Sequence, residues 1–247
     1  MSHPKQPPTP GPLQFLGTPR GTQLVVAGAV LLCVGAVVVL ALWGGDDSDG
    51  AAAGPTEVTC EAPPTPPAQP KSFTETPDAA LAEGTTWEAT VTTNCGDITF
   101  ELYGDQAPQT VASFLYLAEQ DYWVDSPCHR LTKQGIFVLQ CGDPTGTGGG
   151  DPGYGFGIEN APTDGSYPRG TLAMARTADP NSNGGQFFIV YDDTALPTEG
   201  GGYSIFGEVT GGMEVVDEIV KKGLGGDYGP ESPAQPISIL DISAAKA

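Results

Sequence analysis

The chain has 247 residues, enough for one sizeable domain and additional segments. Its formal net charge is -20, from 30 Asp and Glu against 10 Lys and Arg. We therefore expect no nucleic-acid partner, because contacts to phosphates require clustered Lys and Arg.

The first third of the chain predicts a tail, a membrane span and a linker. Residues 1–22 are rich in Pro and polar residues, which favours a disordered cytoplasmic tail. The run from Leu24 to Trp43 holds no charged residue and no Pro, and as a helix it would cross a bilayer core of about 30 Å. We therefore expect one transmembrane helix over residues 23–43, followed by a Pro-, Gly- and Ala-rich linker over residues 44–84.

Charges on the two sides of this run predict its orientation. Lys5 and Arg20 precede it, and all acidic residues of the chain follow position 45. The positive-inside rule then places the N-terminus in the cytoplasm and the remaining chain outside the cell membrane, as a single-pass protein. A cleaved signal peptide is the alternative, but its apolar region is shorter, about 7–15 residues. A lipoprotein anchor at Cys33 lacks the small residue that would precede it, since Leu32 stands there.

Four further cysteines, Cys60, Cys95, Cys128 and Cys141, follow the expected span. Outside the cytoplasm they can form disulfides, and four cysteines allow three pairings. No Cys-x-x-Cys is present, so neither a zinc ribbon nor a thioredoxin-type redox site is supported.

Residues 85–247 have the pattern of a globular, mainly β domain. One helix is expected from Pro108 onward, where Pro suits the first turn, and a second over Gly212–Lys222. Many short antiparallel strands with two separated helices predict a closed eight-stranded antiparallel β-barrel capped by both helices. The expected strands are Thr86–Thr92, Ile98–Tyr103, Cys128–Leu131, Ile136–Gln140, Thr171–Arg176, Gln186–Tyr191, Ser204–Val209 and Ile237–Ile242.

The segment from Asn181 to Tyr191 is a polar turn that runs into an aromatic strand. Gly184 and Gly185 can adopt backbone angles that other residues avoid. Neighbouring residues of a strand face opposite sides, so Phe187 and its neighbour belong to different faces. Taken alone, the segment is an ordinary turn followed by a core strand.

Several kinds of chemistry are excluded for the extracytoplasmic part. His129 is its only His, which rules out sites with several His ligands, and no Gly-x-Ser-x-Gly motif is present. The glycine-rich stretch Gly142–Gly157 is not followed by Gly-Lys-Ser/Thr, so it predicts a long surface loop and not a phosphate-binding loop. Any enzyme here is therefore expected to work without a metal, a cofactor or a covalent intermediate.

Several spaced motifs occur in one order across about two thirds of the chain, residues 86–245. They are Cys128–Leu131, Phe137–Asp143, Thr171–Arg176, Asn181–Tyr191 and Tyr203–Val209. In this order the sequence resembles the cyclophilins, which are peptidyl-prolyl cis/trans isomerases. With its expected anchor and its cysteines it is similar to the cell-surface cyclophilins of actinobacteria.

The resemblance implies a function and a site. Proline-containing polypeptides would be the substrates, and Arg130 matches the catalytic residue that donates to the prolyl nitrogen in the twisted amide. His129 is expected to be structural, Phe187 to belong to the core, and the protein to be a monomer without cofactors. The positions that match the substrate-binding residues are Phe137, Val138, Gln140, Ala175, Arg176, Gln186, Phe188, Leu196 and Tyr203.

The sequence departs from the family pattern at several positions. Two extra residues separate Arg130 from the Phe137 strand, and one extra residue lies in the stretch 176–181. Ala195 replaces a common Trp, Tyr203 a common His and Arg176 a common Asn. These differences concern drug binding of the cyclosporin type more than catalysis, and they leave substrate preference open.

The strands on either side of Thr132–Gly135 would form a hairpin that carries Arg130. Cys128 and Cys141 would lie at the open ends of this hairpin, where a cross-strand disulfide is geometrically possible. Cys60 and Cys95 would then form the other pair.

Three classes of function compete. The first is an extracytoplasmic prolyl isomerase that assists the folding of exported or cell-surface proteins. The second is a tethered peptide-binding or chaperone module that uses the same groove without relevant catalysis. The third is a structural cell-envelope protein, which only the linker supports.

Overall fold

The computed structural model describes residues 57–247. The tail expected over residues 1–22, the membrane helix expected over residues 23–43 and the first part of the expected linker lie outside the described residues. Within residues 57–247, no helix is both long enough and apolar enough to cross a bilayer.

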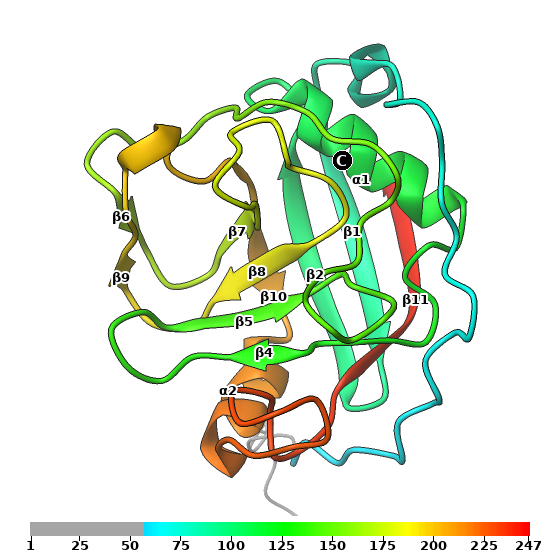
Figure 1. The fold of residues 1–247 in the computed structure, drawn as a ribbon, viewed down its shortest axis with the longest axis vertical. Coiled ribbons are helices and arrows are strands. Elements are labelled where there is room, and N and C mark those ends of the chain that lie inside the picture. The colour runs from blue at the N-terminus through cyan, green and yellow to red at the C-terminus, as the bar shows by residue number, and fades with distance from the viewer. Residues whose placement is uncertain (1–56) are drawn as a thin grey trace, which may run out of the picture. The chain divides into compact units, whose positions relative to one another are not determined.

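A curled sheet of nine strands forms the framework of the domain (Figure 1). Its spatial order is β3-β11-β1-β2-β10-β7-β8-β5-β4, with antiparallel pairing throughout. A separate small sheet pairs β6 (Ser166–Tyr167) with β9 (Thr194–Ala195). The strands of the large sheet are β1 (Thr86–Thr93), β2 (Gly96–Tyr103), β3 (Ser126–Pro127), β4 (Arg130–Leu131), β5 (Val138–Cys141), β7 (Thr171–Met174), β8 (Phe187–Val190), β10 (Ile205–Gly211) and β11 (Ser238–Lys246).

Both predicted α-helices are present, as α1 (Pro108–Glu119) and α2 (Met213–Lys222), and they lie near opposite ends of the sheet (Figure 1). Two short 3-10 helices, η1 (Ala79–Ala82) and η2 (Glu199–Gly201), add to them. Pro108 occupies the first turn of α1, where its missing N–H costs no helical hydrogen bond. The carboxylate of Glu159 accepts the next two backbone N–H groups at 3.0 and 2.8 Å, which satisfies the start of the helix.

The sequence pattern predicts a closed barrel of eight strands, but the structure shows an open sheet of nine strands with β3 and β4 at its edges. Of the expected strand Cys128–Leu131, only Arg130–Leu131 forms a strand, β4, while Cys128 N–H donates to Ile237 O at 2.9 Å and Leu131 N–H donates to Glu231 O at 2.6 Å. The edge strands β3 and β4 are consecutive in the chain, yet β3 pairs with β11 and β4 pairs with β5. The sheet is strongly curled, but its two edges do not pair with each other in the described structure.

Strand alternation divides the apolar side chains between two clusters. In β8, Phe187 and Ile189 face the main core, whereas Phe188 and Val190 face a second, smaller cluster. Phe187 is 1% exposed and packs edge-on against the rings of Phe114 and Trp123, which confirms the prediction that it belongs to the core. The second cluster lies on the outer face of β5, β7 and β8, and it provides the apolar part of the candidate site.

Gly184 and Gly185 serve close packing, not an unusual backbone conformation. Neither has a positive φ. A Cβ at Gly185 would lie 2.7 Å from Cε1 of Tyr122, and one at Gly184 would lie 3.0 Å from Cδ of Pro152. Only glycine therefore lets this turn approach its neighbours so closely.

The described part of the expected linker, residues 57–84, lies against the domain (Figure 1). A disulfide joins Cys60 to Cys95, and beside it Glu61 N–H donates to Asn94 O at 2.7 Å. Phe73 packs against the main core. This segment is thus attached to the folded domain both covalently and by packing.

Candidate active site

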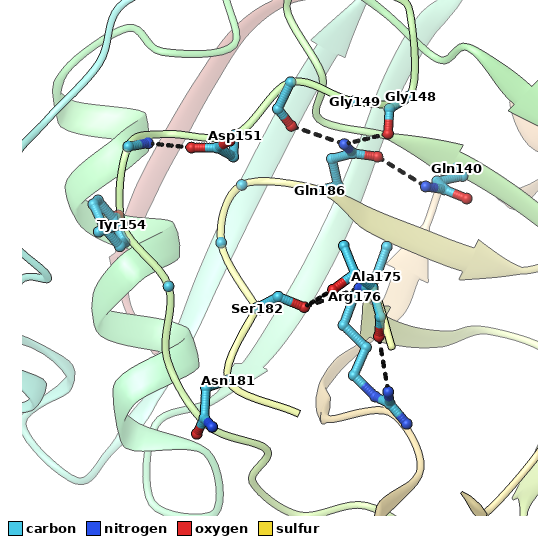
Figure 2. Close-up of a pocket in the computed structure, with 16 residues that line it drawn as sticks. Gln140, Gly148, Gly149, Asp151, Tyr154, Ala175, Arg176, Asn181, Ser182 and Gln186 are labelled. Atoms are coloured by element: carbon cyan, nitrogen blue, oxygen red, sulfur yellow. Dashed lines mark hydrogen bonds between the residues drawn. The ribbon is translucent and has the colours of Figure 1, made fainter. Parts of the chain in front are cut away.

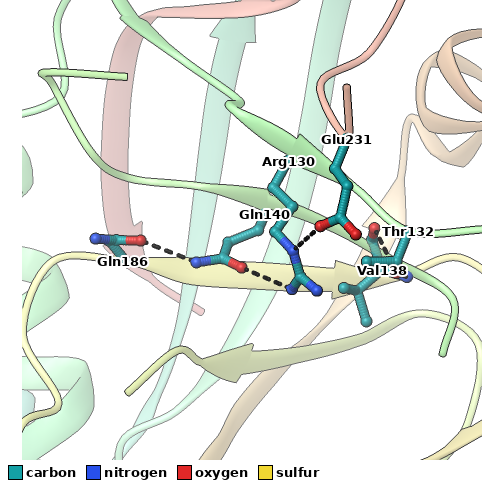
Figure 3. A network of polar contacts seen from close by, with 6 residues as sticks. All are labelled: Arg130, Thr132, Val138, Gln140, Gln186 and Glu231. Atoms are coloured by element: carbon teal, nitrogen blue, oxygen red, sulfur yellow. Dashed lines mark hydrogen bonds and ion pairs between the residues drawn. The ribbon is translucent and has the colours of Figure 1, made fainter. Parts of the chain in front are cut away.

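Arg130 lies in edge strand β4, directly opposite Gln140 of β5. Its Nη1 donates to Oε1 of Gln140 at 3.3 Å, and its Nε donates to Oε2 of Glu231 at 2.9 Å (Figure 3). Two different elements therefore hold the guanidinium, one on each side. This arrangement limits the rotamers of a long side chain that is only partly buried.

The polar chain continues from Arg130 through two amides. Nε2 of Gln140 donates to Oε1 of Gln186 at 2.9 Å (Figure 3). Nε2 of Gln186 in turn donates to the carbonyls of Gly148 and Gly150, at 3.0 and 2.8 Å. Each amide thus donates and accepts in one direction, which fixes its orientation and links Arg130 to the glycine-rich loop.

A pocket of about 300 Å³ opens beside Arg130. Its apolar part comes from the second cluster, with Phe188 4% exposed and Leu196 7% exposed. Its polar part comes from Arg130 and Gln140 at the rim. The pocket is lined by Arg130, Ile136, Val138, Gln140, Ala175, Arg176, Phe188, Leu196, Pro197 and Tyr203. The structure thus brings together Arg130 and all but two of the predicted substrate-binding residues.

Phe137 is one of the two exceptions. It packs against the main core, and its ring lies 6.0 Å from that of Tyr191. Its neighbours Ile136 and Val138 line the pocket instead, because alternate residues of an extended chain share a face. The expectation that Phe137 and Val138 both line the pocket therefore fails, and Ile136 takes the place of Phe137.

Gln186 is the other exception, and it lines a neighbouring pocket of about 420 Å³ (Figure 2). Gln140, Ala175 and Arg176 line both pockets, so the two pockets adjoin, and together we call them the groove. The far wall of the second pocket is the glycine-rich loop 148–155. The sequence pattern indicates only a surface position for this loop.

Arg176 and Tyr203 line the same pocket as Arg130 and contact each other. The guanidinium carbon of Arg176 lies 4.9 Å from the centre of the Tyr203 ring, a cation–π contact. The Nε of Arg176 donates to Gly202 O at 2.7 Å, and Nη2 donates to Glu199 O at 3.1 Å. The Tyr203 ring packs edge-on against Phe188 at 5.8 Å, so the aromatic pair forms a wall of the pocket.

The structure joins Cys128 to Cys141, the pair that the hairpin geometry favours, with 3.9 Å between their Cα atoms. Cys141 directly follows Gln140, and Cys128 lies two residues before Arg130. The disulfide therefore fixes the register of the Arg130–Gln140 pair from one end.

His129 and Asp143 lie behind the polar chain. Burial lowers the pKa of His129 below its usual value, with Asp143 opposing and Arg130 adding to the shift. Burial alone would raise the pKa of Asp143, but hydrogen bonds from Thr145 and from the N–H groups of Gly150 and Gly148 outweigh it and lower the pKa. An ionised Asp143 therefore organises the loop that also binds Gln186.

A neutral His129 beside the cationic Arg130 suits a packing role. His129 is 6% exposed, and neither of its ring nitrogens has a hydrogen-bond partner among the described residues. Within residues 57–247, no three His, Cys, Asp or Glu side chains come together as a metal site.

Besides the loop 148–155, sequence reasoning missed Ile136, Asp143, Pro197 and Glu231 as contributors to the site. The motif Gln140–Asp143 contains the signal for Asp143, because a carboxylate that follows Gly often binds the backbone of its own turn. Ile136 follows from strict alternation with Val138. Glu231 lies about a hundred residues from Arg130, in a Gly- and Pro-rich stretch without periodicity, and no local pattern places it.

Comparisons with known proteins identify the family of the chain. A sequence model of the family "Cyclophilin type peptidyl-prolyl cis-trans isomerase/CLD" matches residues 89–244. The chain is 42% identical over 164 residues to the probable peptidyl-prolyl cis-trans isomerase B of Mycobacterium tuberculosis, a match that covers 61% of this chain and 52% of the relative. It is 39% identical over 206 residues to the protein of the same name in Mycobacterium leprae, covering 75% of this chain and 66% of the relative. The chain thus spans between half and two thirds of these relatives.

Solved structures show the same fold. The crystal structure of a cyclophilin-type isomerase of Cryptosporidium parvum superposes with a TM-score of 0.55 at 33% identity, covering 66% of this chain and 99% of that one. A second structure of that protein was solved in the presence of the dipeptide Ala-Pro and has a TM-score of 0.54. Together with the family match over residues 89–244, these likenesses show that the chain belongs to the cyclophilin-type peptidyl-prolyl cis-trans isomerase family.

Proposed function

We propose that this protein is a membrane-anchored peptidyl-prolyl cis/trans isomerase that accelerates X-Pro isomerisation in exported or cell-surface proteins and so assists their folding. The observation that carries the proposal is the position of Arg130, held between Gln140 and Glu231 at the rim of an apolar pocket. The pocket offers apolar surface for a prolyl ring, and the guanidinium is beside it.

The chemistry needs no covalent step. Rotation about a peptide bond is opposed by about 18–20 kcal/mol because C–N resonance must be broken. In the twisted amide the prolyl nitrogen gains a lone pair, which a guanidinium can bind and which the planar amide lacks. An interaction made only in the twisted state lowers the barrier. Arg suits this role because it remains charged and presents its donors rigidly.

The remaining residues position the substrate. Phe188, Leu196 and Val138 surround the prolyl ring with apolar surface, and the same low-polarity surroundings strengthen the hydrogen bond from Arg130. Gln186 and the backbone at Ala175 and Arg176 bind the chain beside the proline in the second pocket. The substrate is thus a polypeptide that lies along the groove.

The decisive experiment measures isomerisation of a proline-containing tetrapeptide by protease-coupled assay, for the wild type and Arg130→Ala. A hydrogen bond to a charged group is worth about 1.5–3 kcal/mol, so we expect kcat/KM to fall about 10- to 100-fold. Arg130→Lys keeps the charge but loses the planar fork, and it should retain an intermediate rate. An unchanged rate in Arg130→Ala would refute catalysis and favour the peptide-binding module, whose affinity for the peptide should survive the substitution.

The proposed location rests on sequence and cysteine usage. The apolar run over residues 23–43, with Lys5 and Arg20 before it, supports a single-pass anchor with a cytoplasmic N-terminus. Two disulfides favour an oxidising compartment for the domain. Protease added to intact spheroplasts should remove the domain and leave a membrane-bound N-terminal fragment. Protection of the domain until the membrane is lysed would contradict this orientation.

A further inference from the structure

A segment that precedes the family-matched region contacts one wall of the groove. We call residues 71–77 the strap. Phe73 N–H donates to Pro152 O at 2.7 Å, and Nε2 of Gln109 donates to Pro77 O at 2.8 Å. Lys71 pairs with Asp121 at the other end of α1, at 3.5 Å. The strap is therefore attached to α1 near both of its ends and to the loop between them.

Phe73 is the apolar anchor of the strap. Its ring packs edge-on against Tyr116 at 5.1 Å and lies 6.3 Å from the ring of Tyr122. Tyr122 in turn lies so close to Gly185 that a Cβ there would come within 2.7 Å of its ring. Phe73 thus packs on the tyrosine that supports the turn before Gln186.

The strap also touches the loop that forms the far wall of the second pocket. Gly153 has a φ of +94°, and a Cβ at this position would lie 2.3 Å from Phe73 O. Gly153, Tyr154 and Gly155 line the pocket of about 420 Å³ together with Gln186. Figure 2 shows Tyr154 of this group beside the pocket. The strap therefore contacts this wall, although none of its residues lines either pocket.

The wall needs such support because of its composition. Gly148, Gly149, Gly150, Gly153 and Gly155 fall within eight residues, and glycine has the largest backbone entropy to lose on ordering. Asp143 orders the first part of this loop through the N–H groups of Gly148 and Gly150. Contacts with the strap begin at Pro152, so the two ends of the loop are held from different sides.

We propose that the strap, through Phe73, positions the loop 152–155 and thereby sets the affinity of the groove for the residues next to the substrate proline. This proposal rests on the proposed function of the groove. No residue of the strap lines the pocket that contains Arg130. The strap therefore affects peptide binding and leaves the isomerisation rate of the bound peptide unchanged. A loop that is already ordered loses less conformational entropy when the peptide binds.

The test compares Phe73→Ala with Phe73→Leu, and uses Leu81→Ala as the matched control. Leu81 belongs to the same N-terminal segment but is 47% exposed and lies in η1, away from both pockets. We expect Phe73→Ala to raise KM for a tetrapeptide about 3- to 10-fold with kcat unchanged, which corresponds to about 0.7–1.4 kcal/mol of affinity. Phe73→Leu should recover most of the affinity, and Leu81→Ala should match the wild type.

Two further measurements keep the test independent of catalysis. Amide hydrogen exchange over residues 148–155 should accelerate in Phe73→Ala and not in Leu81→Ala. The dissociation constant of a proline peptide, measured by fluorescence without turnover, should rise as KM does. If the wild type proves inactive, the proposed function fails, but exchange and binding still decide the role of the strap.

Gly153→Ala changes the same contact from the loop side, because the added Cβ would lie 2.3 Å from Phe73 O and the φ of +94° also disfavours a side chain at this position. It should weaken peptide binding in the same direction and serves if Phe73→Ala does not fold. Unchanged KM, unchanged dissociation constant and unchanged exchange in a folded Phe73→Ala would overturn the proposal. A fall in kcat with KM unchanged would also overturn it.

Discussion

Nε of Arg130 lies 2.9 Å from a carboxylate oxygen of Glu231. The contact joins an edge strand to a loop that follows α2, over a hundred residues later in the chain. Gln140 holds the same guanidinium from the other side. Glu231 is thus a positioning residue for Arg130, and its carboxylate also offsets part of the positive charge beside the pocket.

Replacing Glu231 should lower activity modestly. Both partners are substantially exposed, at 37% and 63%, so the pair is worth no more than about 0.5–1 kcal/mol. We expect Glu231→Ala to reduce kcat about 2- to 5-fold, with little change in KM, since the effect is on the orientation of Arg130. Glu231→Gln can still accept the Nε–H bond and should keep most of kcat. Equal losses in both variants would argue for charge and not for positioning.

The two neighbours Ile136 and Phe137 should respond differently to truncation. Ile136 lines the pocket, so Ile136→Ala should raise KM for a proline peptide about 3- to 10-fold, because it removes apolar surface that the prolyl ring would cover. Phe137 packs against the main core, so Phe137→Ala should instead destabilise the fold by about 2–4 kcal/mol. Steady-state kinetics and thermal unfolding of both variants distinguish the two faces. A raised KM in Phe137→Ala without a loss of stability would contradict this assignment and show that Phe137 contacts the substrate.

Removing the disulfide between Cys128 and Cys141 should cost stability before it costs activity. It closes a loop with a sequence separation of 13, for which loop closure predicts about 2–3 kcal/mol. The double variant Cys128→Ala/Cys141→Ala should therefore unfold at a lower denaturant concentration than the wild type. The backbone pairing of β4 with β5 also holds Arg130 opposite Gln140, so the hydrogen bonds from Arg130 to Gln186 should persist and kcat at low temperature should stay within about 2-fold. A large loss of kcat in the folded variant would assign the disulfide a role in catalysis.

Much of the site follows from the sequence, because strand alternation and ordered motifs are local signals. Phe187 and Phe188 are assigned to opposite faces by alternation alone, and the structure places them so. The same rule places Ile136 and Val138 on one face, and both line the pocket. The match to the family motif instead assigns Phe137 to the pocket. The two disagree because two extra residues precede this strand and shift the match.

What could not be predicted depends on contacts distant in sequence. The segment 57–84 has the composition of a linker, and one Phe among Pro, Thr and Ala gives no periodic signal. This segment packs on the domain because Phe73 contacts Tyr116 of α1 and its N–H donates to Pro152 O. The expected strand Cys128–Leu131 likewise shortens to β4, and the backbone bonds of Cys128 and Leu131 go to the carbonyls of Ile237 and Glu231, which no pattern around Cys128 indicates.

Acid should destabilise the domain through His129. Burial holds the pKa of His129 below its usual value of 6.5, so the folded state binds this proton more weakly than the unfolded chain does. The resulting stability is present above the unfolded pKa and is lost as pH falls below it, with a slope of at most about 1.4 kcal/mol per pH unit. The free energy of unfolding of the wild type, measured with denaturant, should therefore fall as the pH is lowered from 7 to 5.

The matched variant is His129→Gln, which keeps a polar side chain without a titrating group. Its stability should depend less on pH between 7 and 5, although its absolute stability is lower because of imperfect packing. Asp143 titrates in a separate window, since a carboxyl with a lowered pKa contributes stability that is lost only as pH falls below its ordinary value of 3.8. A pH dependence between 7 and 5 that is identical in wild type and His129→Gln would show that the buried imidazole is not its source.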